Sequence, residues 1–526
     1  MSSLPAVEHR TVTAAFRRAL ETSPHATAHV AEGSSWTFAE TFDRCCRLGA
    51  GLRGVGADRD SPVALMLDNS IDYVHTWLGL ALAGGVQCPV NTGYRGSFLS
   101  HILNDAGCQV IVVEAHYLDR LRPIVDDLQH LRTVVVRGEV TPVEGLEVVA
   151  LAELGTSDPL EPVDVAPGDL MAYMYTSGTT GLSKGVEVSH AHAYTYASRE
   201  DQPRPTSADR ILVTLPLFHL AGQWYGVYQA LIAGATCVVE PAFSVSRFWD
   251  LVRAHGITQT VMLGAMAELL QQAEPRSDDT ENPLTLAVMA PLASNPEAFA
   301  RRFGLTLEPV YGMSEIGAVL GAYGTDLVPG EAGVPRPGYE LRLVDGAGDD
   351  VPDGVIGELW VHPMHPETVL TRYHGLPEKS AETVQDGWVH TGDAFRREDG
   401  HYFFADRMKD SLRRRGENVS SFEVERIINE HPGVLESAVV GVPADLGEDE
   451  IKAVVVPRDG TAIDPVELTS FLVERMPYFM VPRFVRFASE LPKTPTLKIQ
   501  KHVLRDAGTD DCWDREAAGI VLRRGN

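Results

Sequence analysis

Helical and strand-like segments alternate along the N-terminal three-fifths of the chain. Helical patterns over 73–83 and 97–106 are each followed by a short apolar run, at 87–91 and 109–114. Strands separated by helices are typical of layered α/β folds with largely parallel sheets. We therefore expect a large N-terminal α/β domain of layered sheets and helices.

The pattern changes in the C-terminal part of the chain. Short strands with Gly and Asp turns from 333 to 361 predict a small β subdomain. Farther on, a helical segment near 422–430 precedes a strand-like one near 437–442, which indicates a small, compact α+β domain. We place the boundary at Met408–Lys409, which gives an N-terminal domain of residues 1–408 and a C-terminal domain of residues 409–526.

Composition narrows the class of protein. At 526 residues the chain suggests two or more domains. Its net charge of −27 argues against a general nucleic-acid or anionic-membrane surface, which requires a basic footprint. The six cysteines form no C-x-x-C pair, which suits a protein of the reducing cytoplasm, and we expect that location. Neither a signal peptide nor a membrane span of about 20 apolar residues is predicted.

One short stretch, Tyr175–Gly185, combines glycines, hydroxyl side chains and a lysine. Glycine lets backbone N–H groups approach phosphate closely, and a lysine adds a mobile positive charge. A Walker A loop would run from Gly-Lys-Ser/Thr into a helix. Here the lysine precedes Gly185 and a strand-like run at 186–189. We predict a phosphate-binding loop between two strands, and a surface turn is the alternative. The residues expected to bind phosphate are Thr176, Ser177, Gly178, Thr179, Thr180, Gly181 and Lys184.

Three other patterns carry structural interpretations. Thr37–Glu40 has the form of a capping box and opens a helix. Gly49–Gly54 spells G-x-G-x-x-G, but it follows a helix and leads into a strand, the reverse of a dinucleotide site. We interpret it as a helix terminator. His190 and His192 form an H-x-H pair without a third metal ligand nearby in sequence, so we expect them to be structural.

The glycine loop resembles the phosphate-binding signature of the adenylate-forming superfamily, which comprises acyl-CoA synthetases, luciferases and the adenylation domains of peptide synthetases. The resemblance extends over essentially the whole chain, because further blocks follow in the family's order. These blocks are Leu215–His219, Val310–Glu315, Trp388–Asp393, Asp406–Gly416 and Leu491–Ile499. Within the superfamily, residues 413–420 and 447–452 resemble the crotonobetaine/carnitine-CoA ligase-like branch.

The resemblance implies that ATP and Mg²⁺ convert a carboxylic acid into an acyl-adenylate, whose acyl group then passes to coenzyme A. It implies that Glu315 holds Mg²⁺ and that Tyr311 lies against adenine. Asp393 would accept hydrogen bonds from the ribose hydroxyls, and Arg407 would pair with ribose or phosphate oxygens. Catalytic and nucleotide-binding roles extend by the same resemblance to Thr180, Gly312 and Ser314, the last standing where the family usually has threonine.

The resemblance also places a catalytic lysine in the C-terminal domain. Lys498 would reach the carboxylate and the α-phosphate in the first half-reaction. It follows Leu497, whereas the family often has glycine there, and Lys493 and Lys501 flank it. Domain rotation at Lys409 would then open the path for the thiol. A basic run at 413–415 would approach the phosphates of coenzyme A or form a solvated face.

A further set of residues is expected to surround the acid. His219 would lie between the acyl pocket and the thiol path and belong to the catalytic residues. The aromatic members of the set would stack on an aryl acid, surround a quaternary ammonium group, or belong to the core. The set comprises His219, Trp224, Tyr225, Met289, Ala290 and Met313.

Several alternatives share the same nucleotide-binding blocks. A carrier-protein thiol would replace coenzyme A without changing them. An enzyme that adenylates a non-carboxylate such as nitrite would have the same ATP site. A degenerate ATP-binding sensor or scaffold is the non-enzyme alternative. Assembly as a homodimer also stays open.

Overall fold

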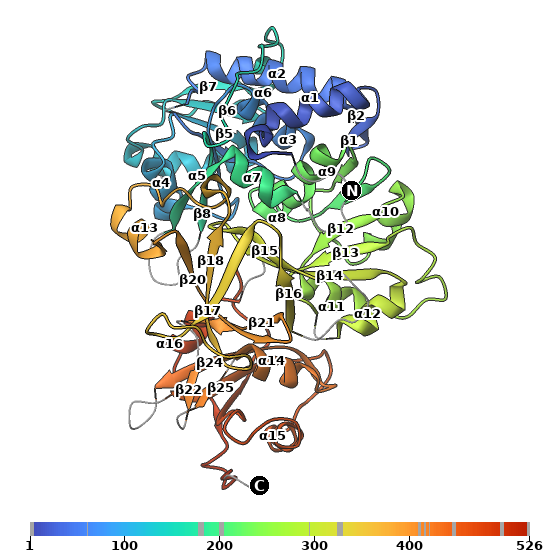
Figure 1. Cartoon of the computed structure of the whole chain (residues 1–526), viewed down its shortest axis with the longest axis vertical. Coiled ribbons are helices and arrows are strands. Elements are labelled where there is room, and N and C mark those ends of the chain that lie inside the picture. The colour runs from blue at the N-terminus through green and yellow to red at the C-terminus, as the bar shows by residue number, and fades with distance from the viewer. Residues whose placement is uncertain are drawn as a thin grey trace. The chain divides into compact units, whose positions relative to one another are not determined.

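The computed structural model divides into two compact units (Figure 1). It describes residues 5–59, 61–176, 183–198, 205–293, 295–322, 330–408, 412–414, 417–419, 421–443, 449–494 and 499–522. The first unit comprises Met1–Leu327, Pro335–Glu340 and Val361–Val389, and the second comprises Val328–Val334, Leu341–Trp360 and His390–Asn526.

One sheet of the first unit has the strand order β7-β6-β5-β3-β4-β8-β9. All its neighbouring pairs are parallel except β8 and β9, which are antiparallel. Its helices bury apolar faces against strands that are themselves almost entirely apolar, as expected for parallel sheets. The strands are β3 Val63–Met66, β4 Gln87–Pro89, β5 Val110–Glu114, β6 Thr133–Arg137, β7 Glu147–Ala150, β8 Leu170–Thr176 and β9 Lys184–Ser189.

A second run of strands in this unit has the order β15-β14-β13-β12-β10-β11-β1-β2. The inner strands are parallel, and β2 and β15 pair antiparallel with β1 and β14. The strands are β1 Thr27–Ala31, β2 Ser34–Thr37, β10 Arg210–Val213, β11 Thr236–Val239, β12 Gln259–Met262, β13 Leu286–Met289, β14 Thr306–Met313 and β15 Gly317–Gly321. The short strand β19, Val384–Gln385, pairs with the start of β20.

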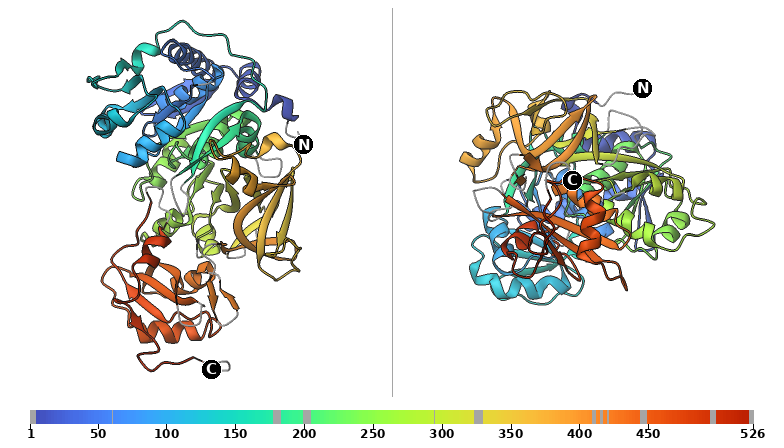
Figure 2. Two further views of the ribbon diagram at one scale, coloured as in Figure 1. Left: turned by 90° about the vertical axis from the view of Figure 1, so that its left-hand side faces the viewer. Right: turned by 90° about the horizontal axis from the view of Figure 1, so that it is seen from below.

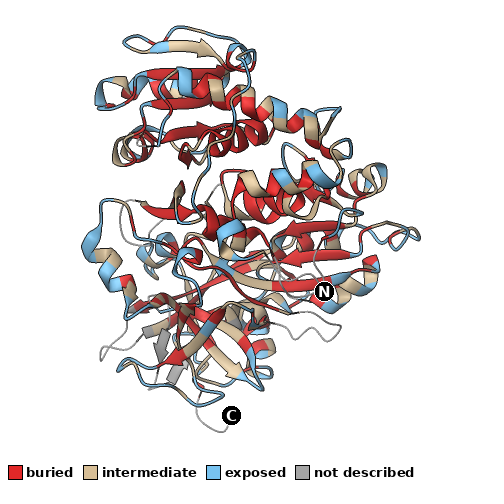
Figure 3. Ribbon diagram, turned by 45° about the horizontal axis from the view of Figure 1, so that its top comes forward, coloured by how far each residue is buried: buried red, intermediate tan, exposed pale blue. Residues whose placement is uncertain are grey.

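Helices connect these strands in the predicted alternation. The longer ones are α1 Val12–Thr22, α2 Phe38–Gly54, α3 Ile71–Leu82, α4 Gly96–Asp105, α7 His190–Ala197, α10 Phe248–His255, α11 Gly264–Gln272, α12 Pro296–Phe303 and α13 Pro377–Thr383. The shorter ones are η1 Val7–His9, η2 Ala115–Tyr117, α5 Leu118–Leu121, η3 Arg122–Asp127, α6 Leu151–Leu154, α8 Leu220–Gly222, η4 Gln223–Tyr228, α9 Gln229–Ala233 and η5 Pro366–Thr368. Figure 3 shows that burial follows the strands and the inner faces of the helices.

Helix α2 confirms one prediction and corrects another. Thr37 and Glu40 form the predicted capping box at its start. The glycines at 49–54 do not follow the helix, because they lie inside it. A Cβ atom added to Gly49 would lie 2.5 Å from the carbonyl oxygen of Gly79 in α3. The missing side chains therefore let α2 and α3 pack closely, which a local turn interpretation could not foresee.

The second unit begins with a small β subdomain and continues into an α+β part (Figure 2). The β subdomain has the order β17-β18-β20-β21-β16. In the α+β part, β24 alternates its side chains between two faces: Ala438 and Val440 join one apolar cluster and Val439 joins the other. The elements are β16 Glu331–Pro335, β17 Tyr339–Val344, β18 Gly357–Pro363, β20 Trp388–Glu398, β21 His401–Arg407, β22 Leu412–Arg414, β23 Glu417–Val419, α14 Ser421–Asn429, β24 Val434–Pro443, β25 Asp449–Pro457, α15 Pro465–Val473, β26 Phe484–Phe487, α16 Lys501–Asp506 and β27 Trp513–Asp514.

The predicted fold class is confirmed: a large α/β part, a small β subdomain and a smaller α+β part. The domain boundary at Met408–Lys409 and the mobility of the C-terminal domain stay predictions, and Lys409 lies outside the described residues. None of the helices in the described part of the chain combines the length and the apolar character that a membrane span requires.

Candidate active site

The predicted phosphate loop connects two antiparallel strands. Thr176, the last residue of β8, pairs with Lys184, the first residue of β9. This confirms the strand–loop–strand arrangement and distinguishes the loop from a P-loop, which leads into a helix. The predicted loop residues Ser177, Gly178, Thr179, Thr180 and Gly181 lie outside the described residues.

Lys184 and Glu315 both lie beside one tyrosine, Tyr373. The ammonium nitrogen of Lys184 is 5.0 Å from the centroid of the Tyr373 ring. The Tyr373 hydroxyl donates a 2.8 Å hydrogen bond to Oε1 of Glu315. Both Tyr373 and Glu315 are 5% exposed, so this bond lies away from bulk water. The structure thus brings together two predicted site residues that are distant in sequence, through a third that the sequence analysis missed.

Backbone contacts fix the segment 370–374, which carries this tyrosine. Leu370 donates its N–H to the carbonyl oxygen of Glu315 at 2.7 Å. His374 donates to the carbonyl of Gly185 at 2.8 Å, and Glu187 donates to that of Arg372 at 3.0 Å. Segment 370–374 therefore lies along β9 directly after Lys184 and also contacts Glu315.

Side chains reinforce the contact between segment 370–374 and β9. The Glu187 carboxylate lies 3.0 Å from Nε of Arg372 and 3.2 Å from Nδ1 of His374. Burial alone would raise the pKa of Glu187, but the hydrogen bonds from His374 and Arg372 outweigh burial and lower it. The hydrogen bond to Glu187 raises the pKa of His374.

The strand β14 contains Tyr311 and Gly312 and ends at Met313. Gly312 is required by packing, because an added Cβ atom would lie 2.3 Å from the carbonyl oxygen of Gly317 in β15. Ser314 and Glu315 follow immediately and are buried. The close β14–β15 pairing therefore sets where the carboxylate of Glu315 emerges.

The donor set around Glu315 fits Mg²⁺ better than a closed protein site. The described residues contain no group of three or more His, Cys, Asp or Glu side chains able to hold a metal. Mg²⁺ usually keeps several water molecules and binds one or two carboxylates together with substrate phosphates. One buried carboxylate, that of Glu315, lies with Lys184 beside Tyr373 and meets this pattern. Burial lowers the pKa of His190 and His192 to about 4 and about 3, and neither belongs to such a group among the described residues.

Asp393 and Arg407 meet on adjacent strands of the second unit. They occupy paired positions on β20 and β21, with Nε of Arg407 3.3 Å from Oδ1 of Asp393. Asp393 is 3% exposed. Its N–H donates to Oγ1 of Thr391, which in turn donates to the carbonyl of Leu359. The aspartate is thus held at a fixed position beside a guanidinium group.

The predicted catalytic Lys498 lies outside the described residues, but both ends of its loop are described. Lys493 and Ile499 form an antiparallel bridge. Lys493 lies 2.6 Å from a carboxylate oxygen of Glu436, and Lys501 lies 2.9 Å from Oε1 of Glu425. The two lysines that could be confused with Lys498 are thus engaged in ion pairs within the second unit.

The predicted acid-binding residues gather partly in the core. His219 immediately precedes α8, which continues into the π-helix η4 with Trp224 and Tyr225. Trp224 is fully buried, and both aromatic rings meet Tyr196 edge-on at 5.9 and 5.8 Å. Such π-helical turns are frequent at functional sites.

One further member of the set packs with one of these rings, and two others lie at strand ends. Tyr225 and Met289 share one buried cluster. Met313 pairs with Gly317 on β15, while Ala290 follows β13 before a cis bond to Pro291. The described residues therefore support the core interpretation for Trp224, Tyr225 and Met289, and the role of the set stays a prediction.

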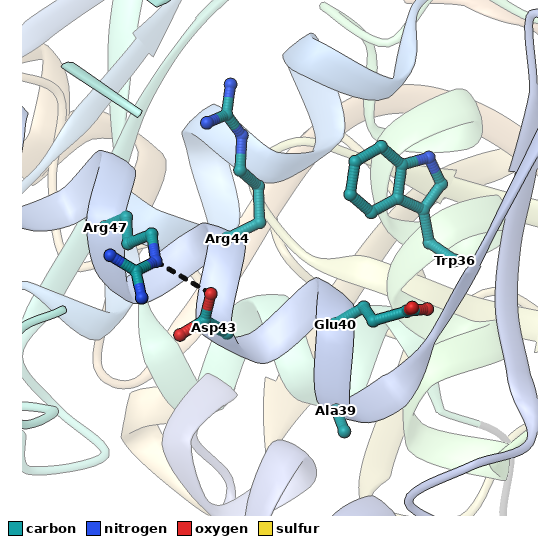
Figure 4. A pocket seen from close by; sticks show the side chains of 6 residues that line it. All are labelled: Trp36, Ala39, Glu40, Asp43, Arg44 and Arg47. Carbon is teal, nitrogen blue, oxygen red and sulfur yellow. Dashed lines mark hydrogen bonds and ion pairs between the residues drawn. The ribbon is translucent and has the colours of Figure 1, made fainter. Parts of the chain in front are cut away.

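A hollow of about 540 Å³ lies elsewhere in the first unit (Figure 4). Its lining comes from β2 and α2 and contains none of the predicted site residues, so it is not part of the candidate site. The lining residues are Trp36, Ala39, Glu40, Asp43, Arg44 and Arg47.

Comparison with known families and proteins gives consistent matches along the chain. The family described as AMP-binding enzyme matches residues 16–371, and the AMP-binding enzyme C-terminal domain matches residues 423–498. A fatty acid–[acyl-carrier-protein] ligase of Streptomyces coeruleorubidus is 33% identical over 92% of this chain and 93% of its own length. A crotonobetaine/carnitine–CoA ligase of Citrobacter koseri is 31% identical over 86% of this chain and 89% of its own length.

Solved structures agree in fold. An anthranilate CoA ligase in complex with anthranoyl-AMP superposes with a TM-score of 0.87 and 26% identity, covering 99% of this chain and 100% of that one. ATP-bound MatB from Rhodopseudomonas palustris superposes with a TM-score of 0.85 and 28% identity, covering 95% of this chain and 99% of that one.

Proposed function

This chain belongs to the family of AMP-binding enzymes, and we propose that it uses ATP to convert a carboxylic acid into an acyl-adenylate and then transfers the acyl group to coenzyme A. The observation that carries the proposal is the convergence of Lys184 and Glu315 on Tyr373 beside the β8–β9 loop. A cation at the start of one strand and a carboxylate just beyond the end of another suit a nucleoside triphosphate with its metal.

In the first half-reaction, a carboxylate oxygen attacks the α-phosphorus of ATP. The bond from that phosphorus to the bridging oxygen breaks, and pyrophosphate leaves with the electron pair. The protein's task is positioning and charge stabilisation, as in other phosphorus transfers. Loop 176–184 would hold the β- and γ-phosphates, with the Lys184 ammonium against their oxygens. Glu315 would hold Mg²⁺, which neutralises phosphate charge when bound.

Asp393 and Arg407 would hold the ribose. The buried carboxylate of Asp393 can accept hydrogen bonds from two vicinal hydroxyls, and Arg407 stays beside it at 3.3 Å. Tyr311 would lie against the adenine ring. Lys498 would donate to the attacking carboxylate and the α-phosphate, a role that the engagement of Lys493 and Lys501 elsewhere supports.

The second half-reaction requires a thiol in place of the leaving pyrophosphate. The thiolate sulfur attacks the acyl carbon, a thioester forms, and AMP leaves. We propose that rotation about Lys409 removes Lys498 and admits the thiol. His219 at the start of α8 would lie beside the path of the thiol, and Trp224 and Tyr225 would border the acid.

A carrier-protein thiol is the second candidate acceptor. The relative from Streptomyces coeruleorubidus is, by its name, a ligase for an acyl-carrier protein, and its identity to this chain is 33%, against 31% for the CoA ligase from Citrobacter koseri. Both acceptors use the same adenylation chemistry. We propose a cytoplasmic location, supported by six free cysteines, five of which are buried.

Pyrophosphate release across a panel of aryl, fatty, short-chain and betaine acids tests the proposal. Each acid is supplied with and without coenzyme A and with a phosphopantetheinylated carrier protein, and nitrite is a separate member. Acid-dependent release that coenzyme A stimulates, with an acyl-CoA of the right mass, is the expected result. Thioester on the carrier protein alone would move the assignment to a carrier-protein ligase. Release with nitrite alone would contradict the carboxylate assignment.

A further inference from the structure

Tyr373 contacts two charged groups of opposite sign through different parts of its side chain. Its hydroxyl donates to Oε1 of Glu315 at 2.8 Å. Its ring face lies 5.0 Å from the ammonium nitrogen of Lys184, within the distance of a cation–π contact. One side chain therefore bears on both the candidate metal carboxylate and the candidate phosphate cation.

The backbone of Tyr373 is fixed by its surroundings. The Tyr373 N–H donates to Oγ of Ser380 at 2.9 Å, and Tyr373 forms an isolated antiparallel bridge with Val186. The residues on either side, Arg372 and His374, both hold Glu187 of β9. Tyr373 is only 5% exposed, and a buried ring on a fixed backbone can orient flexible partners.

The contact with Glu315 has a geometric consequence. The Tyr373 hydroxyl hydrogen points at one carboxylate oxygen, which fixes the rotation of the carboxylate about its terminal bond. The N–H of Leu370 also binds the Glu315 carbonyl, so backbone and side chain of the same glutamate are held by segment 370–374. The carboxylate is thereby presented in one orientation.

We propose that Tyr373 is a positioning residue that orients Glu315 toward the metal through its hydroxyl and Lys184 toward the β- and γ-phosphates through its ring. This inference rests on the nucleotide site of the proposed function. It assigns separable effects to the two halves of one side chain. Loss of the hydroxyl affects the metal, whereas loss of the ring also affects the nucleotide.

Two substitutions separate these effects. Tyr373→Phe keeps the ring, and we expect it to weaken Mn²⁺ binding to the ATP-bound protein about tenfold, as for loss of one hydrogen bond to a charged group. ATP affinity in EDTA should stay unchanged. Tyr373→Leu should weaken metal binding equally and also lower ATP affinity in EDTA severalfold. Free Mn²⁺ is measured by electron paramagnetic resonance, and ATP by displacement of a fluorescent analogue.

Tyr117→Phe is the matched control. The Tyr117 hydroxyl also donates to a carboxylate, Oδ1 of Asp68 at 2.6 Å, and its side chain is also buried, yet neither residue belongs to the candidate site. A generic loss of a buried hydroxyl would affect both variants alike. The proposal expects Mn²⁺ affinity to change in Tyr373→Phe and to match the wild type in Tyr117→Phe.

A double-mutant cycle with Glu315→Gln decides whether Tyr373 acts through the glutamate. If it does, adding Tyr373→Phe to Glu315→Gln causes no further loss of Mn²⁺ affinity. Additive losses, or a Tyr373→Phe variant with wild-type Mn²⁺ affinity, would overturn the proposal. Neither binding measurement needs an acid or a thiol. Failure of the wild type to form any acyl-adenylate would therefore refute the proposed function and leave this test intact.

Discussion

The charged groups of the first unit and the described flanks of the predicted catalytic lysine in the second unit are held in different ways. Lys184 opens a strand and Glu315 directly follows one, and segment 370–374 contacts both through backbone hydrogen bonds and a buried tyrosine. Lys498 instead belongs to a connection whose two ends meet in a single bridge, between Lys493 and Ile499. Ion pairs to Glu436 and Glu425 anchor the flanks of that connection.

This difference matches the chemistry that we propose. Phosphates and their metal need fixed counter-charges throughout, and strands with buried contacts supply fixed positions. A lysine that serves only one half-reaction belongs on an element that can leave the site without disturbing a sheet. The substitution with the largest expected effect on this comparison is therefore the removal of the Lys498 side chain alone.

Lys498→Ala should abolish adenylate formation, with a loss of at least about 10²–10³ in rate, because a preorganised donor at the transition state is removed. Thioester formation from a supplied acyl-adenylate should continue near the wild-type rate. Both rates are measured by quenched mass spectrometry. Equal loss of both halves in a folded variant would contradict the division of labour between the two regions.

Lys409→Pro tests the movement that the comparison requires. Proline fixes the backbone dihedral φ at the proposed pivot and removes its N–H. We expect acid-dependent ATP–pyrophosphate exchange to persist while thioester formation is lost. Lys409→Ala, which leaves the backbone free, is the control and should retain both. Unchanged overall turnover of the proline variant would refute the hinge assignment.

Glu425→Gln weakens one anchor of the lysine loop. Burial raises the pKa of Glu425, yet its carboxylate lies 2.9 Å from Lys501 and accepts the N–H of Val439 at 2.7 Å. Loss of the charge should slow adenylation by about tenfold, as for one hydrogen bond between charged groups. Thioester formation from supplied adenylate should not change. Glu436→Gln tests the other ion pair, Lys493–Glu436, which is more exposed. Its effect on the adenylation rate should be smaller than that of Glu425→Gln. A larger effect would contradict the conclusion that the Glu425 ion pair is the stronger anchor.

His374→Gln probes the contact between segment 370–374 and β9 with the smallest expected effect. Because Glu187 raises the pKa of His374, the pair's stabilisation is fully present below the unfolded pKa of about 6.5 and is lost as pH rises through the folded pKa. The variant should lose at most about 1 kcal/mol of unfolding free energy, since the histidine is partly exposed. Denaturant unfolding at pH 6 and pH 8.5 should show the larger loss at pH 6.

Local patterns predicted much of the fold and the motif-bearing part of the site. The alternation of segments gave α3, α4, β4 and β5, and the residues after Lys184 correctly indicated a strand. Contacts between segments that are distant in sequence could not be predicted from such local patterns. Tyr373 stands between motif blocks with no local signal. Gly49 looks like a terminator until its packing against Gly79 is seen.

Lys452 illustrates the same limit in the second unit. It lies in a strand of apolar residues, and its sequence context shows no partner. The structure buries it completely and directs its ammonium group to the carbonyl oxygens of Leu504 and Gly508, at the end of α16. A helix C-terminus favours a cation, so this lysine caps the helix that follows Lys498. Only the tertiary arrangement reveals that role.

The most direct test of the central claim is a single-turnover experiment with the best acid from the panel. Enzyme in excess is mixed with ATP and the acid in the absence of any thiol, quenched, and examined by mass spectrometry. The account predicts an acyl-adenylate together with pyrophosphate, and conversion of that adenylate to thioester and AMP once the thiol is added. Formation of ADP and phosphate, or of thioester without a preceding adenylate, would contradict it.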